Sequence, residues 1–419
     1  MKTAIVGGGA AGFFCAVNLK ERCPEMEVTI FERSTKVLSK VEVSGGGRCN
    51  CTNSFRDVGD LSTVYPRGHR LMKRLFKVFG PHDAYEWWER HGVRLVTQDD
   101  QCVFPASQDS HTIIDCLMHE CRRHGVEICT GRKIEGLDEL AGYDNVVITT
   151  GGGDSPLLEG HRGEPPVPSL FTFRIDDEAL HDLMGTVVEN AHVQLPGTKL
   201  RASGPLLITH WGMSGPAILR LSSYGARLLA DNGYRMPLSV NWTGTGEADA
   251  ADCLERDSCV PLVASGKPSD QKLTRNTLGM LMEREGRKQL PNVRPFDLPS
   301  RLWDYLLQKG LQGRAHAPWG SLNKKELNRL VNVLTNDQYQ IAGRAPFKDE
   351  FVTCGGVALS AVNPATLESR THPGLYFAGE VLDIDGVTGG FNFQAAWTTA
   401  YVVAQAIADS PRGREDKNE

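Results

Sequence analysis

The stretch at residues 3–12, TAIVGGGAAG, constrains the fold more than any other part of this sequence. Residues 4–6 form a short apolar, partly β-branched run, which is typical of a buried parallel strand. The glycines that follow, Gly7, Gly9 and Gly12, have the spacing G-x-G-x-x-G and lead into an apolar helical face. The first allows a tight turn, the second lets the backbone approach a pyrophosphate, and the third lets helix and strand pack closely. The pyrophosphate would lie at the helix N-terminus, where free N–H groups and the helix dipole favour negative charge.

A second apolar strand supports this interpretation. Residues 27–32, EVTIFE, end in the carboxylate of Glu32, twenty residues after Gly12. A dinucleotide-binding fold places at this distance the acid that hydrogen-bonds the adenosine ribose. The alternative, an ordinary turn between strand and helix, does not account for that carboxylate.

The length of 419 residues predicts two or three domains, because one hydrophobic core rarely serves so long a chain. The net charge is −5 and the sequence pI is near 6.2, so we expect neither a nucleic-acid partner nor an anionic membrane surface. The basic cluster at 67–74 is short and typical of a solvated helix face.

The N-terminus does not resemble a signal peptide, since glycines interrupt the apolar run after three residues. We find no apolar stretch of the 18 or more residues that a membrane-spanning helix needs. The 11 cysteines are odd in number and scattered. This pattern predicts reduced thiols in the cytoplasm, not disulfides or a metal site.

A glycine-rich loop is expected at 44–53, SGGGRCNCTN. Three consecutive glycines beside Ser44, Arg48 and Asn50 allow the backbone to lie flat against a ligand, whereas the alternative is a flexible surface loop. Arg48 offers a planar fork of donors to a phosphate or to the edge of a flavin ring.

The remaining pattern predicts one discontinuous domain with an insert. We expect helices at 69–92 and 113–124, a hairpin at 93–96 and 101–104, and strands at 126–129 and 145–149. The last of these runs into a Thr-Gly-Gly sequence at the ligand-binding edge of a parallel sheet. Prolines after Ser155 mark a change to short β-like runs over 171–242 and then to helices over 270–334, with 249–268 poorly defined.

The end of the chain returns to the first pattern. A strand at 374–380 ends in a Gly-Glu pair, and two glycines precede a helix with an apolar stripe over 393–407. We therefore predict an α/β fold. Its dinucleotide-binding domain is formed by 1–160 and 346–419, and it is interrupted by a β-barrel-like insert at 161–250 and a helical insert at 251–345.

These motifs together resemble bacterial FAD-dependent oxidoreductases of the glutathione-reductase-like superfamily, such as the bile-acid enone reductases and the aminoacetone oxidase family. The resemblance rests on GGGAAG at 7–12, SGGGRCNCTN at 44–53, THWGMSGPAIL at 209–219, FVTCGGVAL at 351–359 and GLYFAGEVLDIDGVTGGFNFQAAW at 374–397. It implies a Rossmann-type FAD-binding domain that is interrupted by an insert with a β-barrel part and a helical part.

The resemblance also implies cofactor contacts. Gly7, Gly9 and Gly12 would hold the pyrophosphate, and Glu32 the ribose. Contacts to the flavin side, to the ribityl chain and from a helix N-terminus would come from Lys40, Ser44, Gly45, Gly46, Arg48, Gly379, Glu380, Gly390, Phe391 and Asn392. Further predicted contacts are Ala10, Ala11, Arg33, Cys49, Lys133, Thr150, Gly151 and Gly152. The chain departs from the family between 151 and 168, where it is shorter, and this affects inferences about substrate.

Three residues are candidates for catalysis: Arg48 as an electrostatic or anchoring group, Cys49 as a thiol near the flavin, and His210 as a proton donor. A redox disulfide between Cys49 and Cys51 is considered as well. If residues 49–51 are extended, the two Cα atoms lie about 6–7 Å apart, at the far edge of the range that a disulfide tolerates. Packing roles are the alternative for both cysteines and for His210. The helix that starts near Asn392 would favour the negative charge of a reduced flavin by roughly 0.3–1 kcal/mol.

The expected function is transfer of a hydride between NAD(P)H, FAD and a small organic substrate, with reduction of an activated C=C bond implied by the resemblance. The sequence contains no second dinucleotide motif, so NAD(P)H would bind transiently at the flavin. An amine oxidase and a tRNA-associated flavoprotein with a structural FAD are the alternatives. The sequence does not indicate an oligomeric state.

Overall fold

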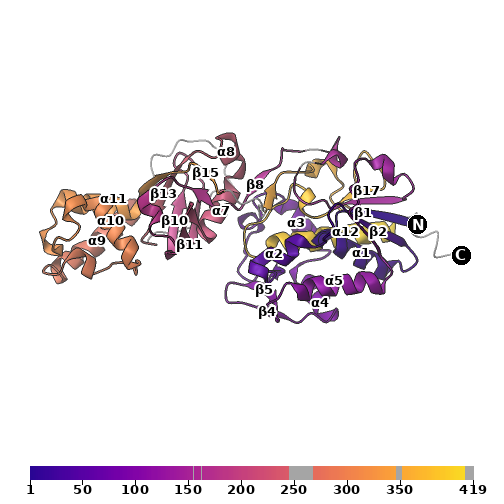
Figure 1. The fold of residues 1–419 in the computed structure, drawn as a ribbon, viewed down its shortest axis with the longest axis horizontal. Coiled ribbons are helices and arrows are strands. Elements are labelled where there is room, and N and C mark those ends of the chain that lie inside the picture. The colour runs from indigo at the N-terminus through magenta and orange to yellow at the C-terminus, as the bar shows by residue number, and fades with distance from the viewer. Residues whose placement is uncertain (154, 162, 245–267, 346–351, 411–419) are drawn as a thin grey trace. The chain divides into compact units, whose positions relative to one another are not determined.

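The computed structural model describes residues 1–153, 155–161, 163–244, 268–345 and 352–410, which form two units (Figure 1). Unit 1 consists of Met1–Val167 and Val352–Glu419, and unit 2 of Pro168–Phe351. The sequence-based boundaries, 160/161 and 345/346, lie slightly N-terminal of these positions. The region 249–267, which the sequence left poorly defined, lies outside the described residues.

Unit 1 contains a five-stranded parallel sheet built from both ends of the chain. Its strand order is β17-β7-β1-β2-β6, with bounds Leu375–Phe377, Asn145–Ile148, Lys2–Val6, Glu27–Glu32 and Glu127–Thr130. The central strand β1 is buried from Thr3 onward, as expected for a strand covered on both faces. Because β17 comes from the C-terminal segment, the predicted discontinuous Rossmann-type domain is confirmed.

The helices of unit 1 flank this sheet. They are α1 (Ala10–Arg22), α2 (Ser39–Gly47), α3 (His69–Leu75), α4 (Pro81–Arg90), α5 (His111–Arg123) and α12 (Phe391–Asp409). A small antiparallel sheet consists of β3 (Thr52–Asn53), β5 (Cys102–Pro105) and β4 (Leu95–Thr97), which confirms the predicted hairpin. The single helix predicted at 69–92 is wrong: Gly80 and Pro81 begin a new helix there, since proline favours the first helical turn.

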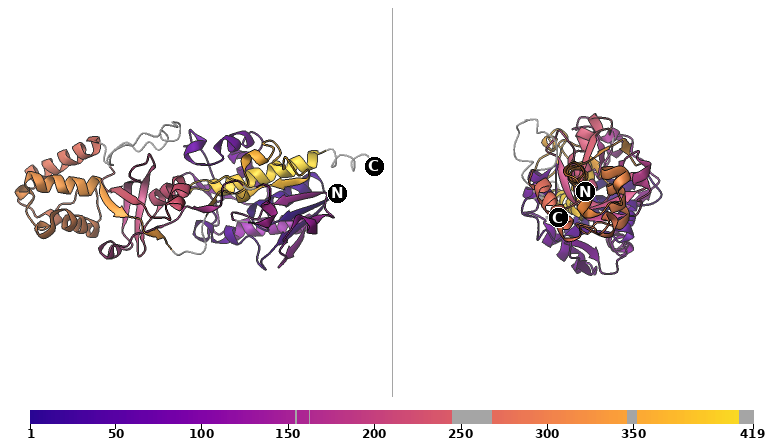
Figure 2. Two further views of the ribbon diagram at one scale, coloured as in Figure 1. Left: turned by 90° about the horizontal axis from the view of Figure 1, so that it is seen from above. Right: turned by 90° about the vertical axis from the view of Figure 1, so that its left-hand side faces the viewer.

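Helices α1 and α12 pack against each other, and α12 is the long yellow helix of Figure 2. Aromatic side chains fill the space between α1, α4 and α12. The ring of Phe14 lies 4.4 Å from that of Trp87 and 5.1 Å from that of Trp397, measured between centroids. This core joins the first helix of the chain to the last, and so fixes the two glycine-rich turns that begin them.

Unit 2 contains a seven-stranded sheet in which every neighbouring pair is antiparallel. The strand order is β14 (Asp337–Gln340), β13 (Pro237–Asn241), β10 (Val187–Gln194), β11 (Arg201–Thr209), β12 (Gly212–Ser214), β9 (Phe173–Arg174) and β15 (Gly343–Arg344). Two further short strands, β8 (Val167–Ser169) and β16 (Val352–Cys354), mark the borders between the units.

Helices α9 (Pro268–Arg284), α10 (Ser300–Leu311) and α11 (Lys324–Thr335) form the helical part of unit 2. The sequence analysis separated this part from the strands at 250/251, but one hydrophobic core runs through both, from Phe171 to Ile341. Helices α6 (Glu178–His181), α7 (Pro216–Tyr224) and α8 (Ala226–Asp231) were not anticipated in a region predicted as β-like. In the part of the chain that the structure describes, none of the helices combines the length and apolar character that a membrane crossing requires.

Candidate functional site

The turn between β1 and α1 has the geometry of a phosphate-binding turn. Gly7 has φ +120°, and a Cβ there would lie 2.3 Å from the carbonyl oxygen of Thr149. A Cβ on Gly12 would lie 2.1 Å from the Gly7 carbonyl oxygen, so this glycine permits close packing of helix and strand, as predicted. At Gly9 a Cβ would meet no atom within 4 Å. The backbone at the start of α1 is therefore open to a ligand at the middle glycine.

Glu32 lies beside this turn at the end of β2. Its Oε2 accepts a hydrogen bond from the Gly8 N–H (2.9 Å), and its Oε1 accepts from the N–H and hydroxyl of Ser34 (2.8 and 2.6 Å). Burial works to raise the pKa of Glu32, but these hydrogen bonds outweigh it and lower the pKa below its ordinary value. A carboxylate offers about four acceptor positions, so the ionised group retains capacity to bind ribose hydroxyls.

The predicted glycine-rich loop is the end of α2. The helix is regular only in its first part, because Ser44 is extended and Gly45 and Gly46 are left-handed, with φ +56° and +69°. Gly47 is left-handed as well, at φ +83°. A Cβ on Gly46 or Gly47 would meet nothing within 4 Å. Successive backbone N–H groups in such turns can form an anion-binding concavity, which supports the predicted role of this loop.

Glu380 links three segments of the site. Its Oε2 pairs with the Lys40 ammonium at 2.7 Å, and its Oε1 accepts from the Thr353 N–H at 2.9 Å. A Cβ on Gly152 would lie 3.0 Å from Glu380 Oε1, and one on Gly151 would lie 3.6 Å from Oε2. The structure thus brings together the end of β7, the helix α2 and the turn after β17, as the sequence motifs predicted.

The first turn of α12 lies against the 50–53 segment. Asn53 donates to the Gly389 carbonyl (3.0 Å), and Tyr65 donates to the Phe391 carbonyl (2.8 Å). The Asn392 side chain holds the backbone of Gly386 by two hydrogen bonds of 2.8 Å. The first N–H groups of α12 have no acceptor within the helix, so its N-terminus is suited to an anionic edge of a ligand.

Two further glycines have packing roles that the sequence did not reveal. Gly390 has φ +86°, and a Cβ there would lie 2.2 Å from the Thr52 carbonyl oxygen. A Cβ on Gly379 would lie 2.7 Å from the Cβ of Ala11. Both glycines therefore allow separate segments of the site to touch, which is a different reason from close approach of a flavin ring.

Of the catalytic candidates, Arg48 and Cys49 lie at this site. Arg48 is exposed, donates to the Gly45 carbonyl (3.1 Å) and stacks over the Phe104 ring. Cys49 is buried, and burial raises the pKa of its thiol to about 12, so the thiol is protonated at neutral pH. Burial raises the pKa of Cys51 as well. The extended backbone considered for residues 49–51 is wrong, because Cys49 has φ +59°, and both cysteines are free thiols.

Three further predicted residues are exposed. His210 is exposed at the turn between β11 and β12 in unit 2, next to the ring of Trp211. Lys133 is exposed and pairs with Glu135 at 2.8 Å. Arg33 is an exposed neighbour of Glu32. Their roles in catalysis or cofactor binding stay predictions.

Sequence reasoning missed the groups that orient the site. Ser34 fixes the Glu32 carboxylate, Thr353 fixes Glu380, and a buried ion pair between Arg67 and Asp385 ties the segment before α3 to the turn before α12. Only the contact of Ser34 is local in the sequence, since it lies two residues after Glu32. The other contacts join residues that lie far apart in the sequence.

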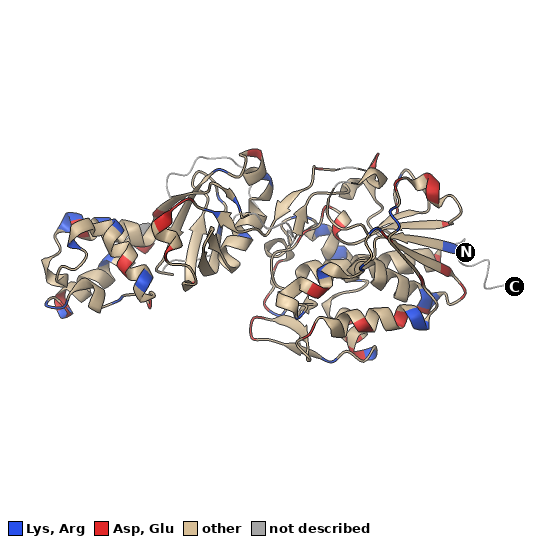
Figure 3. Ribbon diagram, in the orientation of Figure 1, with Lys and Arg blue, Asp and Glu red and all other residues tan. Residues whose placement is uncertain are grey.

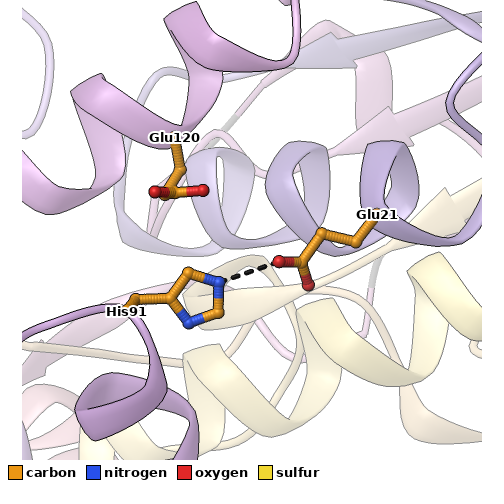
Figure 4. Close-up of side chains that lie close together, drawn as sticks. All are labelled: Glu21, His91 and Glu120. Carbon is orange, nitrogen blue, oxygen red and sulfur yellow. Dashed lines mark hydrogen bonds and ion pairs between the residues drawn. The ribbon is translucent and has the colours of Figure 1, made fainter.

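A second cluster of ionisable groups lies at the opposite end of α1 (Figure 4). Atoms of Glu21, His91 and Glu120 that could ligate a metal ion lie within 4.8 Å of one another. His91 Nδ1 donates to the Trp87 carbonyl (2.7 Å), and Nε2 lies 2.8 Å from Glu21 Oε1. Arg123 already lies 2.9 Å from Glu120 Oε2. We therefore interpret the cluster as an ion-pair network that joins α1, α4 and α5.

This network predicts a pH dependence of stability. Burial works to lower the pKa of His91, but hydrogen bonds to Glu21 and Trp87 raise it above its ordinary value, and the bond from His91 lowers the pKa of Glu21. The His91 contribution is complete below its unfolded pKa of about 6.5 and is lost as the pH rises through the folded pKa. The Glu21 contribution is present above its unfolded pKa and is lost as the pH falls through the folded one.

Replacing His91 by glutamine should therefore cost more stability near pH 5.5 than near pH 8.5, by up to about 1 kcal/mol as for a partly exposed pair. Urea unfolding of wild type and His91→Gln at both pH values measures this difference. The same change at His82, an exposed residue of α4, is the control. Equal losses for His91→Gln at both pH values would contradict the assigned ion pair.

Comparison with known proteins identifies relatives of nearly full length. A 3-dehydro-bile acid delta(4,6)-reductase of Clostridium scindens is 26% identical, over 98% of this chain and 100% of that protein. Ribosomal RNA dihydrouridine synthases of Haemophilus influenzae and Escherichia coli are 27% and 28% identical, over 96% of this chain and 98% and 97% of theirs.

Among solved structures, a 3-ketosteroid delta1-dehydrogenase from Sterolibacterium denitrificans aligns over 97% of this chain and 99% of its own, with 11% identity and a TM-score of 0.46. A flavocytochrome c3 fumarate reductase aligns over 97% of this chain and 78% of its own, with 15% identity and a TM-score of 0.39. The model of the HI0933-like protein Rossmann domain matches residues 1–406. The chain therefore belongs to the HI0933-like family of Rossmann-domain proteins.

Proposed function

We propose that this protein is an FAD-dependent oxidoreductase that uses NAD(P)H to reduce a C=C bond conjugated with a carbonyl group. The observation that carries the proposal is the turn at the start of α1, which is open at Gly9 and closed at Gly7 and Gly12, with the Glu32 carboxylate beside it. This is the arrangement that a dinucleotide requires. The named reactions of the relatives support the chemistry, because a delta(4,6)-reductase and a dihydrouridine synthase both add hydrogen across such a bond.

The residues present fit an FAD. The N-terminus of α1 would bind the pyrophosphate, Glu32 the adenosine ribose, and the glycine turn at 45–47 and the N-terminus of α12 the flavin side. Open space at the Cβ positions of Gly9, Gly46 and Gly47 supports this placement. When bound, FAD would supply the hydride-transfer chemistry.

Groups of the chain itself would position the cofactor and polarise the substrate. The dipole of α12 favours negative charge at its N-terminus by about 0.3–1 kcal/mol. The pair of Lys40 with Glu380 holds the turn after β17 to α2. Arg48, held over Phe104, presents a permanent cation at the exposed side of the loop and is our candidate for anchoring the substrate carbonyl.

Glu32→Ala should weaken FAD retention without unfolding the protein. A hydrogen bond to a charged group contributes about 1.5–3 kcal/mol, which corresponds to roughly 10- to 150-fold in affinity. Flavin absorbance per polypeptide and FAD titration of the apoprotein measure the loss. Glu27→Ala is the matched control, because Glu27 is an exposed carboxylate on the same strand that pairs with Lys2. Full flavin content in Glu32→Ala would refute the ribose assignment.

Anaerobic stopped-flow spectroscopy tests the reaction. We expect NAD(P)H to bleach the flavin absorbance and an α,β-unsaturated carbonyl compound to restore it. Bleaching by amines alone would favour an amine oxidase, and no bleaching by any donor, together with tRNA binding, would favour a structural FAD. Either result would overturn the proposed reduction.

A further inference from the structure

The helical part of unit 2 is strongly basic, in contrast to the chain as a whole (Figure 3). Residues 268–335 contain twelve Lys and Arg and six Asp and Glu, a net charge of +6, whereas the whole chain has −5. The expectation of no nucleic-acid partner rested on the overall charge. The net charge of the whole chain does not show how unevenly the charged residues are distributed along it.

The fold gathers part of this charge at one end of the helices. The segment after α9 meets the short turn before α11: the Gly320 N–H donates to the Gly286 carbonyl, and the Trp319 N–H donates to the Lys288 carbonyl, both at 2.9 Å. A Cβ on Gly286 would lie 3.6 Å from the Cα of Gly320. The end of α9 and the start of α11 are therefore adjacent.

Six exposed cations lie on these two adjoining segments and on the loop that bonds to them, and we call them the basic end: Arg284, Arg287, Lys288, Arg314, Lys324 and Lys325. Arg314 belongs to this group because it donates to the Ser321 carbonyl at 3.0 Å. Lys288 pairs with Glu285, and Arg314 with Glu326. Within the described residues, no carboxylate pairs with the other four.

Lys324 and Lys325 lie in the first turn of α11, where the helix dipole disfavours positive charge. The cap itself is well formed, since Asn323 accepts from the N–H groups of Lys325 and Glu326. Two lysines at this position therefore add nothing to helix stability. Residues that break such a local rule without a compensating gain are expected at functional or strained sites.

We propose that the basic end is a docking surface for RNA. Several exposed, unpaired cations on adjoining segments suit a phosphate backbone, which binds through release of its counterions. The uracil base of RNA has a C=C bond conjugated with a carbonyl, so an RNA substrate fits the proposed reduction, and to this extent the inference rests on the proposed function. Similarity to two ribosomal RNA dihydrouridine synthases agrees with this partner.

Fluorescence anisotropy with a labelled, uridine-containing RNA hairpin tests the proposal at several salt concentrations. The double variants Lys324→Gln/Lys325→Gln and Arg284→Gln/Arg287→Gln should each weaken binding about tenfold or more at moderate salt. Each should also reduce the slope of log K against log salt by about 1.4–1.8, because each of the two lost phosphate contacts removes roughly 0.7–0.9. Thermal stability of the lysine variant should be unchanged or slightly higher, since it removes an unfavourable interaction with the dipole of α11.

The matched control is Arg94→Gln/Arg122→Gln, which removes the same charge from exposed positions of unit 1. Equal effects of this control and of the basic-end variants would overturn the proposed surface. Equal binding of a DNA hairpin of the same sequence, or preference for vesicles of anionic lipid, would overturn RNA as the partner. RNA binding is measured without NAD(P)H, and flavin bleaching without RNA, so failure of the docking surface and failure of the proposed reduction are distinguishable.

Discussion

Gly390→Val should abolish FAD binding and destabilise unit 1 by about 2–5 kcal/mol. The new Cβ would lie 2.2 Å from the Thr52 carbonyl oxygen, and the valine would have to adopt φ +86°. Left-handed backbone costs a β-branched residue at least about 1–2 kcal/mol, and overpacking against a fixed backbone costs about 1–3 kcal/mol more. Thermal unfolding and flavin content of the variant measure both effects.

Gly92→Val separates the cost of a left-handed backbone from the cost of overpacking. Gly92 has φ +80°, but a Cβ there would meet nothing within 4 Å. This variant should lose only the backbone contribution, about 1–2 kcal/mol, and keep its flavin. If Gly390→Val were as stable as Gly92→Val and retained FAD, the close contact between the 50–53 segment and α12 would be wrong.

Arg67→Met should cost about 3–5 kcal/mol, because it leaves the fully buried carboxylate of Asp385 without its cation. Arg67 donates to both oxygens of that carboxylate, with Nε 2.5 Å from Oδ1. Burial works to lower the pKa of Arg67, but Asp385 outweighs it and raises the pKa. We also expect weaker FAD binding, since this pair fixes the turn that carries α12. Chemical denaturation and FAD titration measure the two losses.

Lys2→Met provides the comparison for an exposed pair. Lys2 lies 2.8 Å from Glu27, and both side chains are more than half exposed, so its loss should cost no more than about 1 kcal/mol. Similar costs for Lys2→Met and Arg67→Met would show that Asp385 is solvated when its partner is absent.

Local sequence patterns were sufficient for the dinucleotide-binding half of the fold. The apolar run of β1, the glycines after it and the carboxylate at the end of β2 each report on a few neighbouring residues. Their physical requirements are therefore visible in the sequence. The same holds for β17 and the apolar stripe of α12, which showed that the domain closes with its C-terminal segment.

The errors in the predicted structure arose where a local signal was misjudged or where tertiary contacts determined the backbone conformation. Gly80-Pro81 was a visible helix start that the apolar spacing of 69–92 concealed. Cys49 takes a left-handed conformation because the chain turns sharply out of the glycine loop, which no propensity indicates. In unit 2, helix α7 begins at Pro216, after Gly215, in a region that was interpreted as β-like because of the short apolar runs on either side of it.

For some predicted site residues, the tertiary structure adds contacts that the sequence could not reveal. Gly390 was predicted to face a flavin, and the structure adds that it makes room for the Thr52 carbonyl. Glu380 was predicted to bind the cofactor, and the structure adds its partners Lys40 and Thr353, which lie 340 and 27 residues away. Such contacts depend on the packing of whole elements and cannot be inferred from spacing in one sequence.

The FAD content of Gly9→Val tests the central claim most directly. Gly9 has φ −96° and ψ −169°, which valine adopts readily, and its Cβ points into open space. The apoprotein should therefore keep its fold, at a cost of about 1 kcal/mol because valine is a poorer N-cap than glycine. The side chain should fill the place of the pyrophosphate. We predict stoichiometric FAD in the purified wild type and little or none in Gly9→Val. Normal flavin content in the variant, or a wild type that binds no FAD on titration, would contradict the proposed site.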